Sequence, residues 1–152
     1  GGTDVLRPLA HWTGRSGAAS GALAFMPVRS NAELDAALRA AGRPVMVDFY
    51  ADWCVSCKEM ERFTFSDDAV RQRLARAALL KIDVTANSTE DRALLRRFGL
   101  FGPPGTLFFD AQGRELVDSR VIGYQPAERF LQTLDSAGLG AGSQCKNNAV
   151  LC

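Results

Sequence analysis

Two cysteines separated by two residues form the strongest chemical signal in the sequence. They lie in Trp53-Cys54-Val55-Ser56-Cys57-Lys58, directly after the apolar run Val45–Tyr50 and at the expected start of a helix. In the first turn of a helix this spacing brings two sulfur atoms within bonding distance. The unpaired N–H groups of a helix N-terminus favour a thiolate on the first cysteine. The motif therefore predicts dithiol–disulfide exchange, with Cys54 as the exposed nucleophile and Cys57 as the more buried resolving thiol.

Half of a zinc site is the alternative interpretation of this pair. The other two cysteines, Cys145 and Cys152, are separated by six residues in a segment that follows a glycine-rich stretch. Zinc knuckles use a tighter spacing and a loop, not a junction between a strand and a helix. We therefore favour a redox pair and expect no metal and no organic cofactor besides the Cys54–Cys57 disulfide. For the tail cysteines, a structural disulfide and an intermolecular cross-link both stay open.

Two carboxylates are placed to tune the cysteine pair. Asp48 is the only charged residue in the strand expected over Val45–Tyr50, and burial there raises the pKa of a carboxyl. Glu61 follows Cys54 by seven residues and Cys57 by four, so it shares a helix face with both. A carboxylate so placed opposes thiolate formation and can accept or return a proton during exchange. The alternatives are a satisfied polar group of the core for Asp48 and a solvated helix residue for Glu61.

A proline pair precedes one of the expected strands, in Gly102-Pro103-Pro104-Gly105-Thr106. Pro104 is a candidate cis proline, because cis peptide bonds occur almost only before proline. A cis bond there would set the backbone of Pro103 opposite the sulfurs, ready to pair with an extended peptide, whereas an ordinary strand entry is the alternative. Three aromatic residues are candidates for the same partner surface, with packing inside the protein as the alternative: Trp53, Tyr50 and Phe101.

Length and composition limit the molecule that carries these residues. The chain has 152 residues, of which 47% are hydrophobic and 23% charged, with a formal net charge of +1. These values indicate one globular domain and exclude a nucleic-acid binder that works through bulk charge. The single histidine, His11, argues against histidine-based acid–base chemistry. No apolar run approaches the roughly 18 residues that a membrane-spanning helix needs.

We expect three parts along the chain. Residues 1–23 are rich in glycine, alanine and serine and predict a linker or flexible arm, and residues 139–152 predict a flexible tail. A folded domain is expected over 24–138. The chain begins with Gly1-Gly2-Thr3-Asp4, without a methionine or a signal pattern, which indicates a piece of a longer protein or a processed product.

The middle part carries the strands and helices that must position the cysteines. Strands are expected at 24–28, 45–50, 79–84, 106–109 and 115–117, the last two joined as a hairpin by Asp110-Ala111-Gln112-Gly113. Helices are expected from a Ser30/Glu33 capping box to Gly42, over 54–65, from Ser66, from Asn87 or Ser88 to Gly99, and from Pro126 as first helical residue. The order predicts an α/β fold, a three-layer sandwich whose central mixed β-sheet is flanked by helices.

The segment from Pro44 to Glu59 resembles the active site of thioredoxin-fold proteins, and most closely the C-terminal periplasmic domains of the DsbD family of thiol:disulfide interchange proteins. The similarity covers about residues 25–135 and continues through 64–67, 83–87 and 107–110. It implies a thioredoxin fold, with Cys54 as nucleophile, Cys57 as resolving thiol, Asp48 and Glu61 as acidic modulators and Pro104 as the cis proline. The chain departs from the family pattern after Pro104, where Gly105 stands in place of the more usual threonine.

The resemblance also implies a function and a location. In this family the domain is periplasmic and belongs to a bacterial inner-membrane protein. It takes electrons from a membrane-embedded domain and passes them to the N-terminal periplasmic domain of the same protein, which supports disulfide isomerisation and cytochrome c maturation. Nucleic acid is not among the partners expected. A disulfide oxidase or isomerase on the same fold and a non-catalytic binding module are the alternatives, and the presence of both cysteines argues against the second.

Overall fold

The computed structural model describes residues 23–140, so the expectations for residues 1–22, His11, Cys145 and Cys152 lie outside the described residues. Within that range the elements follow one another as β1 (Met26–Pro27), α2 (Asn31–Ala41), β2 (Val45–Tyr50), α3 (Val55–Glu59), the π-helix η1 (Met60–Thr64), α4 (Asp68–Leu74), β3 (Ala78–Asp83), α5 (Thr89–Arg97), β4 (Gly105–Phe109), the 3-10 helix η2 (Val117–Ser119), β5 (Val121–Ile122) and α6 (Ala127–Ser136). None of these helices is long and apolar enough to cross a membrane.

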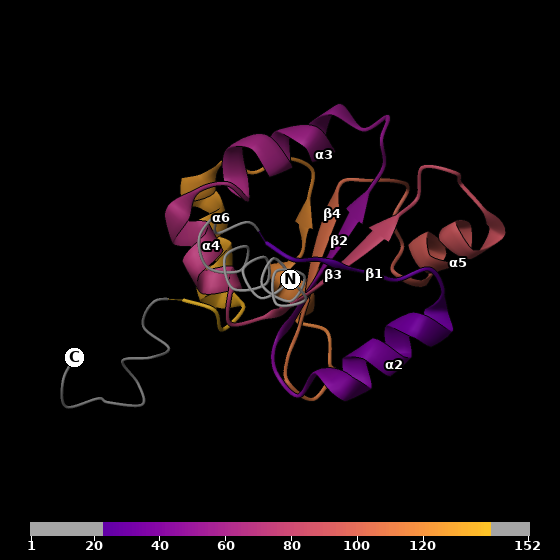
Figure 1. Cartoon of the computed structure of the whole chain (residues 1–152), viewed down its shortest axis with the longest axis horizontal. Coiled ribbons are helices and arrows are strands. Elements are labelled where there is room, and N and C mark those ends of the chain that lie inside the picture. Colours follow the sequence, from indigo (N-terminus) through magenta and orange to yellow (C-terminus); the bar gives the residue numbers. More distant parts are fainter. Residues whose placement is uncertain (1–22, 141–152) are drawn as a thin grey trace, which may run out of the picture.

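The five strands form one mixed sheet in the order β1-β3-β2-β4-β5 (Figure 1). The pairs β1–β3 and β3–β2 are parallel, whereas β2–β4 and β4–β5 are antiparallel. The central strand β2 has all six residues buried, as its nearly continuous apolar sequence predicts. Its register places Asp48 between Lys81 of β3 and Thr106 of β4.

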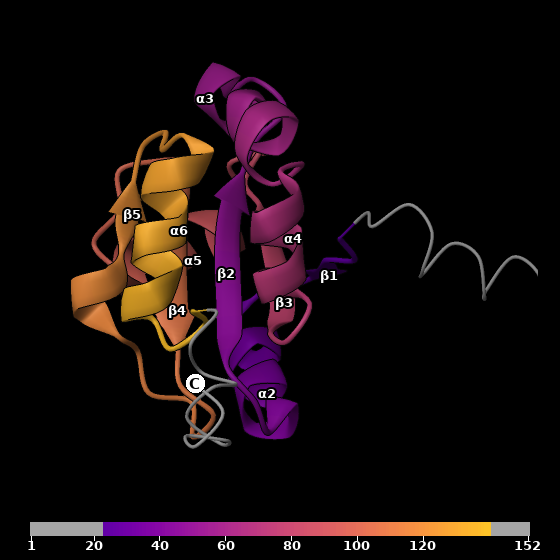
Figure 2. The ribbon, with the colours of Figure 1, turned by 90° about the vertical axis from the view of Figure 1, so that its left-hand side faces the viewer.

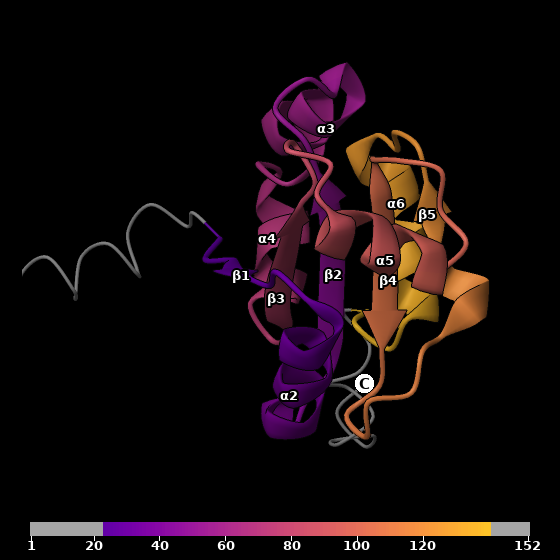
Figure 3. The same ribbon diagram turned by 90° about the vertical axis from the view of Figure 1, so that its right-hand side faces the viewer.

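Helices cover both faces of the sheet, so the predicted three-layer sandwich is confirmed. Figure 2 shows α4 and α6 in front of one face, and Figure 3 shows α2 and α5 in front of the other. Two hydrophobic clusters fill the layers. One joins Leu34 of α2 and Leu94 of α5 to the sheet, and the other joins Leu74 of α4 and Phe130 of α6 to the opposite face. Along β2, Val45, Val47 and Phe49 belong to the first cluster and Met46 to the second, as the alternation of side chains in a strand requires.

The helix starts follow the predicted capping residues with two differences. Ser30 accepts a hydrogen bond from Glu33 N, but the Glu33 carboxylate accepts from Arg29 N, so the reciprocal bond of a capping box is not made to Ser30. For α5 the cap is Ser88, in a full capping box with Asp91, and not Asn87. Gly99 ends this helix in the left-handed region, with φ of 69°, as its position predicts.

The predicted hairpin after β4 is wrong in its second strand. The turn forms, because Gly113 N donates to Asp110 O, but Glu115 contributes only a single bridge to Phe109. Val117 begins the 3-10 helix η2, and the antiparallel neighbour of β4 on the side away from β2 is the unpredicted strand β5. A two-residue strand has too few positions for an alternating pattern, which is why the sequence did not indicate it.

Three helix boundaries also differ from the expectation. The helix expected from Ser66 begins at Asp68, because Asp67 is its N-cap and accepts a hydrogen bond from Val70 N. Pro126 is the N-cap of α6 and not its first helical residue. The helix expected over 54–65 is present but changes from α3 to the π-helix η1 at Met60, where Phe65 N donates to Met60 O. Contacts with Gln125 stabilise the wider π-helical turn. Thr64 Oγ1 donates to Gln125 O at 2.5 Å, and Gln125 N lies 3.3 Å from Met60 Sδ. Sequence periodicity does not report such tertiary contacts.

Candidate active site

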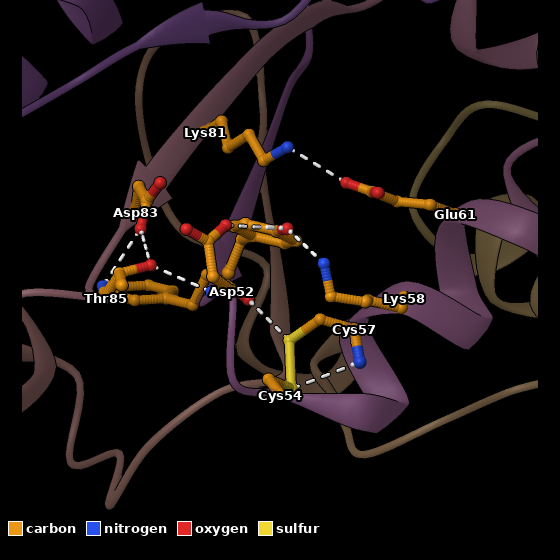
Figure 4. Close-up of polar contacts among 10 residues, drawn as sticks. Asp52, Cys54, Cys57, Lys58, Glu61, Lys81, Asp83 and Thr85 are labelled. Atoms are coloured by element: carbon orange, nitrogen blue, oxygen red, sulfur yellow. Dashed lines mark hydrogen bonds and ion pairs between the residues drawn. A yellow bond between two sulfur atoms is a disulfide. The ribbon is translucent and has the colours of Figure 1, made fainter.

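The two cysteines of the motif are joined by a disulfide bond. Cys54 is the N-cap of α3 at the end of the loop that leaves β2, and Cys57 lies in the first turn of the helix. Their Cα atoms are 5.2 Å apart, which is within the ordinary range for a disulfide. The bond between the two sulfur atoms is drawn in yellow in Figure 4.

The surroundings of the two sulfur atoms differ in a way that distinguishes their chemistry. Cys57 N donates a hydrogen bond to Cys54 Sγ at 3.1 Å, and such a donor stabilises negative charge on that sulfur. Cys57 Sγ instead lies 3.8 Å from the carbonyl oxygen of Phe49, which carries negative partial charge and suits a thiol proton better than a thiolate. The asymmetry favours Cys54 as the attacking thiolate and Cys57 as the thiol that resolves.

Cys54 is less exposed than the sequence predicted. It is 6% exposed and Cys57 is 3% exposed, so the two differ only slightly in burial. The reason is tertiary, because both cysteines pack into the same hydrophobic cluster as Tyr50 and Ala51. The polar contacts of the sulfurs, more than their exposure, therefore separate the two roles.

The loop that carries Cys54 is tied to the end of β3 by Thr85. Asp52 N donates to Thr85 Oγ1 at 2.8 Å, and Trp53 Nε1 donates to Thr85 O at 3.1 Å. Thr85 is held in turn by Asp83, whose carboxylate accepts from Thr85 N and Thr85 Oγ1 (Figure 4). As a result the indole of Trp53 is fixed in orientation although the residue is 60% exposed.

Asp48 is buried on the face of β2 that it shares with Met46, and it is 5% exposed. No residue within 23–140 donates a hydrogen bond to its carboxylate. Burial raises the pKa of Asp48 from 3.8 to about 7, the positive charge of Lys81 opposes the rise, and the negative charge of Glu61 adds to it. The predicted rise in the pKa of Asp48 is therefore confirmed, and a carboxyl with this pKa exchanges protons readily near neutral pH.

Glu61 lies in η1 and pairs with Lys81, whose positive charge also acts on Asp48. Lys81 Nζ is 2.9 Å from Glu61 Oε2, and Figure 4 shows the two side chains extended toward each other. Lys81 also lies over the ring of Tyr50, with its Nζ 4.0 Å from the ring centre. Glu61 is thus an exposed residue with a defined ion pair, close enough to Asp48 to act on its charge.

Tyr50 links the site to a second lysine. Lys58 Nζ lies 3.1 Å from the Tyr50 hydroxyl oxygen, which donates its own proton to Asp52 Oδ1 at 3.0 Å. This hydrogen bond raises the pKa of Lys58 above its ordinary value. Tyr50 itself is 8% exposed, so its ring packs inside the protein rather than on an open partner surface.

The Pro103–Pro104 peptide bond is cis, so the expected cis proline at Pro104 is confirmed. Pro104 leads directly into β4, where Gly105 pairs with Phe49, the residue whose carbonyl lies against Cys57 Sγ. Pro103 and Pro104 are partly exposed at this end of the sheet. Phe101, two residues before Pro103, is fully exposed. The structure therefore brings the proline loop to the same edge of the sheet as the disulfide.

Several residues of this site were not predicted from the sequence: Asp52, Lys58, Lys81, Asp83 and Thr85. Lys81 carried a signal, since it is a lone charge in the apolar run of β3 and a natural counter-charge for Asp48. Thr85 carried none, because its role depends on contacts with a loop more than 30 residues away. Within 23–140, no three histidine, cysteine or acidic residues are grouped to hold a metal ion.

The fold and the site together define a thiol:disulfide oxidoreductase. A family model described as a thioredoxin-like domain matches residues 32–138. A thiol:disulfide interchange protein DsbD of Ralstonia nicotianae is 56% identical over 146 residues, which is 90% of this chain and 23% of that protein. Crystal structures of the Neisseria meningitidis DsbD C-terminal domain are also similar. The oxidised form is 36% identical with a TM-score of 0.62, and the reduced form 37% identical with a TM-score of 0.63.

These two structures are matched over 99% of their length and over 75% and 74% of this chain, respectively. The chain therefore belongs to the thioredoxin-like domain family, among the C-terminal domains of DsbD proteins. It spans about 23% of the length of the DsbD protein that it matches.

Proposed function

We propose that the chain is a protein-disulfide reductase domain of a bacterial inner-membrane protein, located in the periplasm. It receives electrons from a membrane-embedded domain and delivers them to an N-terminal periplasmic domain of the same protein, in support of disulfide isomerisation and cytochrome c maturation. The observation that carries the proposal is the Cys54–Cys57 disulfide at a strand-to-helix junction, with Cys57 N donating to Cys54 Sγ. The similarity to DsbD C-terminal domains supports the direction of electron flow.

The reductive half of the cycle has two exchange steps. The Cys54 thiolate attacks one sulfur of the partner disulfide, whose S–S bond breaks, and the other partner sulfur leaves and takes up a proton. Cys57 then loses its proton, and its sulfur attacks Cys54 Sγ and releases the second partner sulfur, which is protonated in turn. The partner gains two electrons and two protons, and the domain is left with the Cys54–Cys57 disulfide. A dithiol of the donor domain restores the reduced form by the reverse sequence.

Asp48 is the proposed acceptor of the Cys57 proton. Its pKa of about 7 allows it to take up a proton during oxidation of the pair and return it during reduction. Asp48 is next in sequence to Phe49, whose carbonyl lies against Cys57 Sγ. Glu61 is proposed to modulate this carboxyl through its charge and through its ion pair with Lys81.

The partner is proposed to bind across the exposed side of the disulfide. Trp53 is held there by Thr85, and Phe101 projects fully into solvent ahead of Pro103 and Pro104. An extended partner segment is proposed to pair with the backbone at Pro103. Tyr50 is assigned to the support of the active-site loop and not to direct contact, because it is buried.

The test of this proposal is trapping of the mixed disulfide. Cys57→Ala is expected to accumulate a covalent complex with the oxidised N-terminal domain through Cys54, seen on non-reducing gels and located by mass spectrometry. Cys54→Ala is the matched control and is expected to trap nothing. A complex that forms with Cys54→Ala instead reverses the two roles, and the absence of any complex with either variant contradicts the proposed partner.

The reduction potential tests the direction of electron flow. Equilibration of the wild-type domain with glutathione is expected to give a potential more negative than about −200 mV, as for reductants of this fold. A value near that of a strong oxidant, about −120 mV, would instead identify a disulfide oxidase.

A further inference from the structure

A groove lies between α5 and the loop that leads to Pro104. Its volume is about 460 Å³, which is enough for a large side chain. Its apolar surface comes from Leu95 and Leu100, and Phe101 forms an apolar rim that is fully exposed. A fully exposed phenylalanine next to an apolar groove is the arrangement expected where another molecule binds.

The charge of the groove has one sign. Arg92 and Arg96 line it, and no aspartate or glutamate does. These two arginines are four residues apart on α5, a spacing at which like charges face each other and weaken an isolated helix. Arg92 donates only to a backbone carbonyl, that of Asn87, at 2.6 Å, and Arg96 makes no ion pair with any residue in 23–140. The next arginine, Arg97, differs because it points to α2 and pairs with Asp35 at 2.8 Å.

The loop that forms the rim of the groove also carries the cis proline of the redox site. Phe101 and Pro104 are three residues apart in one loop, and the residue after Pro104 pairs with Phe49, which contacts Cys57 Sγ. A partner segment that pairs with the backbone at Pro103, as proposed above, binds two residues away from Phe101 in this loop. Side chains that flank the partner disulfide can then bind Arg92 and Arg96, which line the same groove as Phe101.

We propose that this groove is a docking subsite for the protein partner, and that it binds an apolar side chain flanked by carboxylates. The inference rests on the proposed function, because it concerns the partner of the same cysteine pair. The apolar side chain packs on Leu95, Leu100 and Phe101, and the carboxylates pair with Arg92 and Arg96. The subsite thereby selects acidic partner segments over basic ones and increases their rate of encounter.

The experiment measures reduction of three cystine-linked peptides by the reduced full chain. The peptides share one leucine near the cystine, and its neighbours are glutamate, glutamine or lysine. The wild-type chain is expected to reduce the glutamate peptide with a kcat/KM about tenfold above that of the lysine peptide, since two partly exposed ion pairs together contribute about this much. The preference is expected to shrink as salt is added.

Variants with reversed charge test whether Arg92 and Arg96 cause the peptide preference. Arg92→Glu combined with Arg96→Glu is expected to invert the peptide preference. The matched control is Arg39→Glu combined with Arg43→Glu, which makes the same change in net charge at exposed positions in and just after α2 and is expected to keep the wild-type preference. Phe101→Ser, at a position with no packing to lose, is expected to lower kcat/KM several-fold for all three peptides.

The outcomes distinguish failure of the docking subsite from failure of the reductase function. Equal rates on the three peptides, or equal effects of the two double variants, overturn the subsite while the reductase function stands. Failure of the wild-type chain to reduce any peptide overturns the proposed function, and the subsite with it.

Discussion

Replacement of Asp48 by asparagine is expected to stabilise the oxidised domain at alkaline pH. In the folded chain burial raises the pKa of Asp48 from 3.8 to about 7. Between these two pH values the folded state keeps a proton that the unfolded state has already released. The wild-type free energy of unfolding therefore falls as pH rises from about 4 to about 7. Below about pH 4 the carboxyl is neutral in both states and contributes no penalty.

The size of the effect follows from the two pKa values. They differ by about 3 pH units, and each unit corresponds to about 1.4 kcal/mol, so the full penalty above pH 7 is about 4 kcal/mol. Asparagine has the shape of the neutral carboxyl and cannot ionise, so it does not carry this penalty. The opposing attraction of Lys81 is already contained in the net pKa of Asp48.

The assay is urea unfolding of the oxidised protein at a series of pH values from 4 to 8. The variant is expected to equal the wild type near pH 4 and to exceed its free energy of unfolding by about 4 kcal/mol at pH 8. Asp118→Asn is the control, because it removes the same charge at an exposed position. Parallel curves for the variant and the wild type across this range would refute the assignment of Asp48 as a buried carboxyl with a raised pKa.

Three further predictions concern the active-site loop and the tail. Asp48→Asn is expected to move the thiolate absorbance of Cys54 in the reduced protein to lower pH, because a nearby negative charge is removed, and an unchanged titration would remove Asp48 from the mechanism. Thr85→Ala is expected to lower the free energy of unfolding by about 1 kcal/mol, measured in urea, because Asp52 N loses its acceptor, with Thr85→Ser retaining most of it. Deletion of 141–152 is expected to leave the rates of disulfide exchange unchanged, and a large loss would assign a role to the tail.

The deletion begins at 141 because the domain extends slightly beyond the boundary expected at 138. Leu139 is buried, and its backbone carbonyl accepts a hydrogen bond from Arg76, as does that of Gly140. A flexible tail was expected from the glycine content of this segment. Composition alone does not reveal that Arg76, which is distant in the sequence, binds the backbone carbonyls of this segment.

Much of the fold and the centre of the site could be predicted because the signals are local. The apolar run of β2 predicted a strand covered on both faces, and a lone carboxylate in such a strand has to lose its water, so burial and a raised pKa for Asp48 followed directly. Ser88 and Gly99 bounded α5 through capping interactions that span only a few residues. The spacing of Cys54 and Cys57 predicted their disulfide for the same reason.

The tertiary structure alone decided the features that depend on chain segments far apart in the sequence. The register of β2 against β3 brings Lys81 beside Asp48 and into contact with Glu61, and the packing of the core covers Cys54. The turn after β3 places Thr85 where it holds the loop of Trp53. Such contacts arise when the sheet assembles and its helices pack, and no periodicity within one segment encodes which distant residue will lie opposite.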